Sequence, residues 1–334
     1  MRKTITSVSG AALLLISVAA CGDASGSQEQ GEASANYPEE NLTMIVGYGP
    51  GGSTDVGARL MADALEDELG VNVTVENKEG AGGQVGLTAV ANADCDGYTF
   101  GTANFPSAIV SVLDESRGAT YDRESFAPIG LQVVDPTAIV VAPDSPYDTI
   151  DDLLAAAEET PGELLYTTTG VASNEHFAMV AVQEATGAEF APVHFPDGGG
   201  APKTAFLGGE VEVYVANVSD VVEMTENGQG KVIGIMDSER SPFLPDVPTF
   251  TEAGHDVEIS SSRGYAFPAC APEEAVTTIS ETMGTIMEDE EFQTKMKELG
   301  LAPSYRDAAA YTEYWTETEG TFETLFPLVR EEGK

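Results

Sequence analysis

The feature that most constrains the fold is an apolar run, a glycine-rich loop and an amphipathic segment in direct succession. Residues 42–46 are short and apolar, which is typical of a buried strand. The loop 47–55 reads Gly-Tyr-Gly-Pro-Gly-Gly-Ser-Thr-Asp. Residues 53–69 repeat apolar side chains at helical spacing, and Gly70 stands where helices usually end. A strand that passes through a tight loop into a helix is the unit of a parallel sheet with crossover helices.

This unit recurs along the chain in two blocks. We expect strands, loops and helices in alternation at 71–76, 80–83, 84–91 and 98–103, and again at 164–167, 168–173, 174–186, 190–195, 197–200, 201–207, 211–216 and 232–236. Extended segments at 137–141 and 257–267 lie between and after the blocks. The pattern predicts an α/β fold with two lobes joined by two crossings, which form a hinge beside a cleft. Closing helices at 273–299 and 307–329 are expected to pack on the first lobe.

The charge of the chain restricts its partners. It carries 56 acidic and 15 basic side chains, for a formal net charge of −41. Binding to nucleic acid requires clusters of Lys and Arg that neutralise phosphates. The composition therefore excludes nucleic acid as a partner.

The first residues have the pattern of an export signal. Arg2 and Lys3 precede the apolar run 11–20, which is too short to span a bilayer comfortably and ends in small residues before Cys21. This resembles a bacterial lipobox, so we predict a lipoprotein signal peptide over 1–20 and lipid attachment at Cys21. Residues 21–36 are rich in Gly, Ser, Glu and Gln and are predicted to be a flexible tether. The expected location is the outer face of the cytoplasmic membrane, or the periplasmic side.

Two further cysteines, Cys95 and Cys270, leave two alternatives open. An exported domain meets an oxidising compartment in which they can pair. Their spacing fits neither a zinc site nor a redox Cys-x-x-Cys motif. They are either a disulfide or two buried free thiols.

The glycine-rich loop has the chemistry of an anion site. Backbone N–H groups at the start of a helix point toward the ligand, and the helix dipole favours negative charge there. Ser53 and Thr54 can add hydroxyl donors. Asp55 either caps the helix by accepting first-turn N–H groups or contacts an amine of the ligand.

The same loop also permits an enzymatic interpretation. Gly47-x-Gly49-x-x-Gly52 matches the dinucleotide fingerprint, and Glu76 ends the next strand as a ribose-binding acid would. Pro50 stiffens the turn, however, and an exported protein meets little nicotinamide cofactor. An exported α/β hydrolase-like or nucleotide-binding enzyme that uses this loop is therefore the alternative function.

Other catalytic and metal signals are weak. The chain has no Gly-x-Ser-x-Gly motif, and no Lys follows the last glycine of the loop as in a phosphate-binding loop. His176 falls in the first turn of a predicted helix, where it either lines the cleft or packs. No set of His, Cys and acids has metal-ligand spacing. We expect no catalytic residue, no metal and no cofactor.

Taken together, the motifs resemble one family. They occur in order from about residue 37 to residue 303: Tyr37-Pro38, the Gly-Gly-Ser-Thr-Asp turn at 51–55, Val-Glu-Asn-Lys at 75–78, Gly-Ala-Gly-Gly-Gln-Val-Gly at 80–86, Asp-Gly-Tyr-Thr at 96–99, Leu-Gly-Gly-Glu-Val-Glu-Val at 207–213 and Arg-Ser-Pro-Phe-Leu-Pro-Asp-Val-Pro-Thr at 240–249. They are similar to the Bug family, the periplasmic binding receptors of tripartite tricarboxylate transporters.

The resemblance implies a two-lobed periplasmic-binding-protein fold of type II, with each lobe a mixed sheet flanked by helices and a two-segment hinge. Lobe I would comprise 37–140 plus 265–334, and lobe II 141–264. Such a receptor is no enzyme. It is expected to be a monomer that closes on a small carboxylate (a dicarboxylate or tricarboxylate, an acidic amino acid or an aromatic acid) and delivers it to membrane permease subunits.

The resemblance also implies a set of ligand-binding residues, drawn from loops of both lobes. One carboxylate would be held by main-chain groups and water at the first-lobe loop. The expected residues are Tyr48, Gly49, Gly51, Gly52, Ser53, Thr54, Asp55, Asn104, Thr169, Gly170, Ser173, His176, Gly198, Gly199 and Arg263.

The chain departs from the family in the second lobe. Asp197 stands where a Lys is common and Cys95 where a Pro is usual, and the family commonly has an aromatic side chain near Arg263, within residues 260–265. Arg263 is either a clamp on a second carboxylate or an arginine of the hinge or surface. The ligand is therefore not determined by the resemblance.

Overall fold

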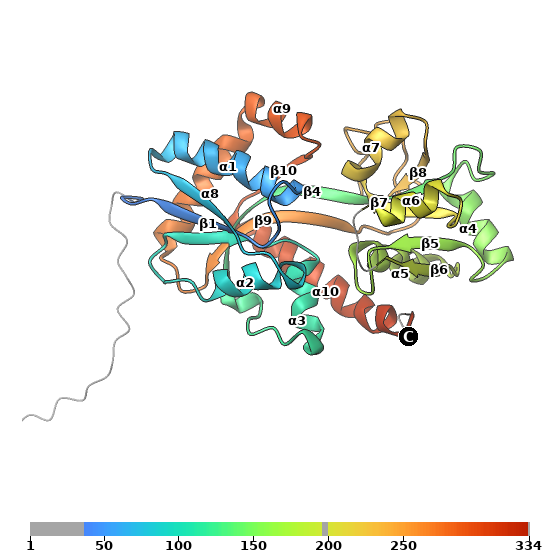
Figure 1. Cartoon of the computed structure of the whole chain (residues 1–334), viewed down its shortest axis with the longest axis horizontal. Helices are drawn as coiled ribbons and strands as arrows, with labels where there is room; N and C mark the ends of the chain where they lie inside the picture. The colour runs from blue at the N-terminus through green and yellow to red at the C-terminus, as the bar shows by residue number, and fades with distance from the viewer. Residues whose placement is uncertain (1–36, 196–199, 333–334) are drawn as a thin grey trace, which may run out of the picture. The chain divides into compact units, whose positions relative to one another are not determined.

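Strand β4 (Phe126–Val141) organises the fold because it takes part in both halves of one sheet. The computed structural model describes residues 37–195 and 200–332. Their ten strands form one sheet in the order β2-β1-β3-β9-β4-β7-β5-β6, with β8 and β10 paired to β4. The fold is α/β with a mixed sheet, as predicted (Figure 1).

The first half of the sheet begins with the predicted strand–loop–helix unit. Strand β1 (Leu42–Val46) lies parallel between β2 (Val73–Asn77) and β3 (Thr99–Thr102). Strand β9 (Ser260–Pro268) then runs antiparallel between β3 and β4, and β10 (Pro303–Arg306) adds to β4. The helices of this half are α1 (Ser53–Leu69), α2 (Gln84–Ala91), α3 (Ser107–Leu113), α8 (Glu273–Glu288) and α9 (Glu290–Glu298).

The second half of the sheet uses the end of the same strand. From Thr137 onward β4 pairs with β7 (Val213–Asn217) and, from Ala138, with β8 (Lys231–Ile235). Strand β5 (Leu165–Thr168) lies parallel between β7 and β6 (Ala191–His194). The helices of this half are α4 (Ile150–Glu159), α5 (Asn174–Thr186), α6 (Ala201–Leu207) and α7 (Val218–Glu226).

The predicted helices with clear end signals have the predicted bounds. Helix α1 begins after Gly52 and ends at Gly70, whose left-handed conformation (φ 70°) suits a glycine. The closing segment 273–299 differs from the single helix expected there. It is two helices, because the Asp289 carboxylate accepts the Glu291 N–H and starts a new helix. Helices α3, α4 and α7 and strand β10 were not predicted.

The last helix, α10 (Ala308–Glu332), contacts both halves, whereas the sequence placed it on the first. Trp315 packs on Phe105 of the first half, with ring centroids 4.9 Å apart. Further along, Phe322 packs on Phe177 of α5, with centroids 4.4 Å apart. The apolar residues of this helix do not separate clearly into two groups along the sequence. Its contacts with both halves could therefore not be predicted.

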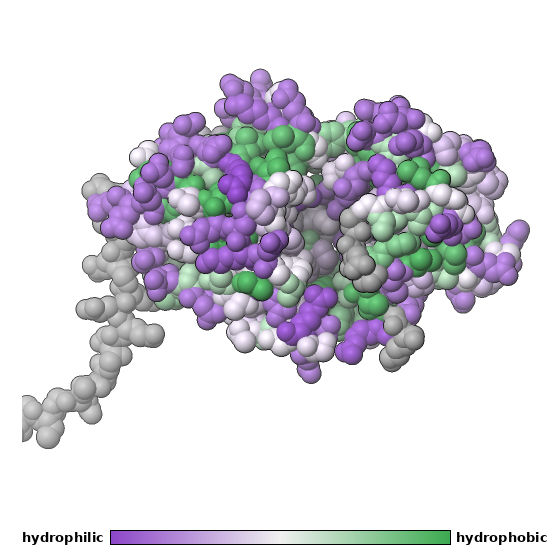
Figure 2. Space-filling model, in the orientation of Figure 1, coloured by the Kyte–Doolittle hydropathy of each residue, from purple (hydrophilic) through white to green (hydrophobic). Residues whose placement is uncertain are grey.

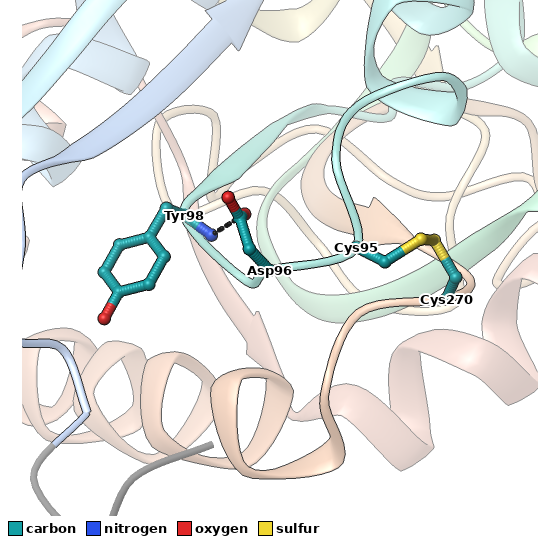
Figure 3. The surroundings of a disulfide bond; sticks show 4 residues. All are labelled: Cys95, Asp96, Tyr98 and Cys270. Carbon is teal, nitrogen blue, oxygen red and sulfur yellow. Dashed lines mark hydrogen bonds between the residues drawn. A yellow bond between two sulfur atoms is a disulfide. The ribbon is translucent and has the colours of Figure 1, made fainter. Parts of the chain in front are cut away.

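The structure joins Cys95 and Cys270 in a disulfide, one of the two alternatives left open by the sequence (Figure 3). The bond connects positions 175 residues apart, with their Cα atoms separated by 5.1 Å. It ties the turn before β3 to the turn after β9. In the same turn, the Tyr98 N–H donates to the Asp96 carboxylate (2.9 Å).

Within residues 37–195 and 200–332, no helix combines the length and the apolar character needed to cross a membrane.

Candidate ligand-binding site

The glycine-rich loop after β1 owes two of its glycines to local geometry. A Cβ on Gly47 would lie 3.0 Å from the Gly83 carbonyl oxygen, and a Cβ on Gly86 of α2 would lie 2.4 Å from the Gly47 Cα, so little space is left for a side chain here. Gly51 has φ of +82°, which side chains rarely tolerate. Packing and turn geometry thus explain these positions without a bound pyrophosphate.

Asp55 is a buried acid that stabilises this loop through hydrogen bonds. It is 2% exposed, and its carboxylate accepts hydrogen bonds from the Gly51 N–H (2.8 Å), Asn77 Nδ2 (2.7 Å) and Arg59 Nε (3.0 Å). Burial raises the pKa of Asp55, but these hydrogen bonds outweigh it and lower the pKa below its ordinary value. Asp55 braces the loop, and its oxygens accept neither a first-turn N–H nor, with these partners in place, a ligand amine.

The start of α1 remains open to a ligand. Gly52 is extended (φ −74°, ψ 162°), and no side chain caps the helix. Gly51, Gly52 and Ser53 are exposed, while Thr54 is half-buried and its hydroxyl accepts a hydrogen bond from Asn104 Nδ2 (3.1 Å). Uncapped N–H groups at the positive end of a 17-residue helix can bind an anion.

Tyr48 of the loop is influenced by the charge of Arg263. Its hydroxyl donates to Ser107 Oγ at the start of α3 (2.9 Å). The surrounding protein raises the pKa of Tyr48, and the Ser107 hydrogen bond and the charge of Arg263 oppose that rise. The positive charge of Arg263 therefore acts on Tyr48 of this loop.

Arg263 is a buried residue of β9 and not a surface arginine. It is 9% exposed, and one nitrogen, Nη2, lies 3.4 Å from Asp135 Oδ2 on β4. Its other terminal nitrogen, Nη1, is buried without a hydrogen-bond partner among the described residues. Asn104 lies opposite Arg263, because Ala103 and Phe105 pair with Gly264 and Ser262 on either side.

The boundary between the two halves contributes acids that sequence reasoning missed. Asp135 accepts hydrogen bonds from the Ser219 N–H (3.1 Å) and Oγ (2.6 Å) at the start of α7. Asp220 follows and is reached by solvent. The protein around it and the negative charge of Asp135 raise its pKa to about 6. The signal available in the sequence was another strand-to-helix junction at 217–218, which was overlooked because α7 was not predicted.

The predicted second-half loop is largely satisfied by its own protein groups. Thr169 Oγ1 donates to Glu175 (2.8 Å), Ser173 caps α5 through the His176 N–H (3.4 Å), and Gly170 has φ of +132°. His176 is fully buried. Its Nδ1 accepts from the Ala172 N–H (3.3 Å) and its Nε2 lies 3.1 Å from Glu332 on α10, so it packs and does not line a ligand site.

Three predicted positions, Gly198, Gly199 and Cys21, lie outside the described residues. On the face shown in Figure 2 the surface is hollowed between the two halves of the sheet, and most of the remaining surface is hydrophilic. The described residues contain no group of three His, Cys, Asp or Glu side chains placed to hold a metal.

Comparison with known proteins assigns the chain. Residues 57–326 match the model of the tripartite tricarboxylate transporter family receptor, TctC. The chain belongs to this family. It is 33% identical over 226 residues to Protein BugT of Bordetella pertussis, which covers 67% of this chain and 69% of that protein.

Solved structures support the same fold for this receptor. A TctC solute-binding protein from Polaromonas, solved without ligand, is 28% identical with a TM-score of 0.78, and the match covers 87% of this chain and 99% of that one. MatC from Rhodopseudomonas palustris with bound malate is 23% identical with a TM-score of 0.69 over 87% of this chain and all (100%) of that one. This TctC-family protein is thus a solute-binding receptor, a class that is in general not enzymatic.

Proposed function

We propose that this receptor is an exported lipoprotein that binds a small carboxylate between two lobes and delivers it to the permease of a tripartite tricarboxylate-type transporter. The lobes would be 37–140 plus 265–334 and 141–264, with the hinge where β4 and β9 pass from one to the other. Cys21 would carry the lipid. The ligand class proposed from the sequence, a dicarboxylate or tricarboxylate, an acidic amino acid or an aromatic acid, contains the malate bound to the relative MatC.

One observation carries the proposal: a buried guanidinium nitrogen without a partner lies near an uncapped helix start. Arg263 Nη1 has no acceptor among the described residues, and burying an unpaired donor is costly. The open N-terminus of α1 offers further N–H groups. A carboxylate satisfies both.

The free energies expected from a few hydrogen bonds and a helix start are enough for micromolar binding of a carboxylate. A hydrogen bond to a charged group contributes roughly 1.5–3 kcal/mol, and a helix start contributes about 0.3–2 kcal/mol. Micromolar affinity requires about 8 kcal/mol. A few such donors reach that value even after the cost of ordering the ligand. At a net charge of −41, long-range attraction of an anion does not help, so short-range donors must carry binding.

Isothermal titration calorimetry of the purified protein against mono-, di- and tricarboxylates, amino acids and aromatic acids tests the proposal. We expect saturable binding of at least one carboxylate, with matching stabilisation in thermal unfolding. If no member binds and none stabilises the protein, the carboxylate receptor is wrong.

Lipid attachment is tested separately. In a bacterium that processes lipoproteins, the chain is expected in the membrane fraction, and Cys21→Ala is expected to release it. Mass spectrometry of the N-terminal peptide then shows whether diacylglycerol is present. An unmodified Cys21 would contradict the anchor and leave ligand binding untouched.

A further inference from the structure

Acidic side chains lie around Asp220 at the start of α7. Asp135 and Glu175 both bear on Asp220 as like charges, while Arg263 and the half-buried Lys203 oppose them. These four side chains are the charged groups that act on Asp220. Like charges held close together near a protein surface repel one another. A second ligand carboxylate at this place would be repelled.

Asp220 lies in the first turn of α7, where a negative charge suits the helix dipole, but its side chain makes no cap hydrogen bond. Its neighbour Ser219 already donates its N–H and its hydroxyl to Asp135, so the start of α7 is served. Among residues 37–195 and 200–332, no group donates a hydrogen bond to the Asp220 carboxylate. The Asp220 side chain is exposed, so a ligand as well as solvent can contact it.

A second, independent observation comes from Asn174 in the first turn of α5. It is 6% exposed, and its Nδ2 donates to Thr137 Oγ1 (2.7 Å) and Asn217 Oδ1 (3.1 Å). These two acceptors fix the orientation of the amide. Its Oδ1 is then a buried acceptor without a donor among the described residues. Asn217 also exchanges hydrogen bonds with Ser261, two residues from Arg263 on β9.

Four buried polar atoms lack a hydrogen-bond partner among the described residues: Arg263 Nη1, Asn174 Oδ1, Asn104 Oδ1 and Ser262 Oγ. Two of them, Arg263 Nη1 and Asn174 Oδ1, have opposite requirements. Arg263 Nη1 is a donor that lacks an acceptor, and Asn174 Oδ1 is an acceptor that lacks a donor. A plain carboxylate satisfies the first only. A protonated amine satisfies the second and also neutralises part of the charge around Asp220.

We propose that the ligand carries a protonated amine as well as a carboxylate, and that Asp220, Glu175 and Asn174 form the site for the amine. This inference rests on the proposed function, because it places the ligand carboxylate at Arg263 and the start of α1. The ligand class is an amino acid or a similar zwitterion. Asp55, which sequence reasoning considered for an amine, is excluded from this role by its three protein donors.

Calorimetry with matched pairs of compounds tests the inference. Each pair differs only in the amine: L-glutamate and glutarate, L-aspartate and succinate, L-alanine and propionate. We expect the amine-bearing member of at least one pair to bind about ten- to a hundredfold more tightly, the range of one charged hydrogen bond. Asp220→Asn is expected to weaken that member about tenfold and to leave its partner unchanged or tighter.

The variants carry their own controls. Asp63→Asn removes a carboxylate from the exposed face of α1 and is expected to change neither member. Asp220→Glu keeps the charge and is expected to retain the preference for the amine. Circular dichroism and thermal unfolding establish that each variant is folded.

The outcomes separate the two proposals. If both members of each pair bind equally, if the desamino compounds bind more tightly, or if Asp220→Asn leaves the preference unchanged, the amine site is wrong and carboxylate binding stands. If no member of any pair binds and no other carboxylate does, the proposed function fails as well.

Discussion

The loops that open α1 and α5 are built from the same strand–loop–helix pattern but leave opposite groups free. At α1, Gly52 provides no cap, and the helix start is exposed. At α5, the Ser173 hydroxyl accepts the His176 N–H and caps the helix, and the Glu175 carboxylate accepts from Thr169. The first loop can therefore attract an anion, and the second presents a carboxylate.

The two halves also differ in how firmly their loops are held. Three hydrogen bonds to Asp55 and the disulfide from Cys95 to Cys270 brace the first half. At the start of α7, the surrounding protein and the negative charges of Asp135 and Glu175 raise the pKa of Asp220, and Arg263, which pairs with Asp135, opposes that rise. We therefore expect a braced anion site in the first half and an excess of negative charge around Asp220. We expect the specificity of binding to arise around Asp220, where a ligand can compensate that charge.

Removing Arg263, the cation shared by the two halves, is expected to have the largest effect on stability and binding. Arg263→Ala leaves Asp135, which is 3% exposed, without its cation, and we expect a loss of about 3 kcal/mol in the free energy of unfolding. Carboxylate affinity should fall about ten- to a hundredfold. Urea unfolding and calorimetry measure the two effects.

A double variant separates these effects. Arg263→Gln with Asp135→Asn removes both charges, so most of the stability should return while carboxylate affinity stays low. Recovery of affinity along with stability would show that Arg263 serves only to neutralise Asp135.

Removing the disulfide should weaken the bracing of the first half without altering the site. Replacing Cys95 and Cys270 by Ala frees a loop of 175 residues in the unfolded chain and is expected to cost about 2–4 kcal/mol. Ligand affinity should change less than about twofold, because the bond lies before β3 whereas Asn104 follows the other end of that strand. A large loss of affinity would contradict the separation between bracing and binding.

Asp55→Asn tests the bracing of the loop itself. Its carboxylate accepts charged and backbone donors, so we expect a loss of about 2 kcal/mol at pH 7 and weaker binding of carboxylates. Because its pKa in the folded protein lies below the ordinary value of 3.8, its contribution is present above that value and is lost as the pH falls through the lowered pKa.

Acid unfolding checks the sign. The difference in stability between wild type and Asp55→Asn should be constant near neutral pH and should shrink below about pH 4. A difference that persists at the lowest pH at which both proteins fold would assign the effect to lost packing and not to the charge.

The smallest expected effect concerns Asp220. Its pKa is raised to about 6, so ionisation above that pH costs stability in the free protein. Asp220→Asn should therefore raise the Tm by roughly 2 °C at pH 7.5 and not at pH 4, where wild-type Asp220 is protonated. Thermal scans without ligand at both pH values measure this, with Asp63→Asn as control. An equal gain at both values would remove the argument that the second half is electrostatically unsatisfied.

The elements with strong local signals could be predicted from the sequence. Helices α1, α2, α5 and α6 have the predicted bounds because glycines or capping residues mark their ends. Helix α7 was missed because Val218–Glu226 follows its strand without a loop, and the break at Asp289 was missed because apolar periodicity continues across it. The same limit applies to the site. A glycine-rich loop can be recognised from consecutive residues, but interactions between charged groups on β4, β9 and the helix after β7 cannot.

The α/β class and the family could be identified from the sequence, and the glycine-rich loop could be proposed as an anion site, because these depend on residues that are close along the chain. Which buried groups lack a partner became visible in the folded protein. Arg263 and Asp135 are 128 positions apart in the sequence. Their ion pair, and the Arg263 nitrogen that has no partner among the described residues, could therefore not be predicted from residues close along the chain. Asp55 and Asp220 look alike as first-turn acids, yet one is satisfied by three donors and the other by none among the described residues. Hydrogen-bond satisfaction depends on neighbours in space, and the fold alone supplies those.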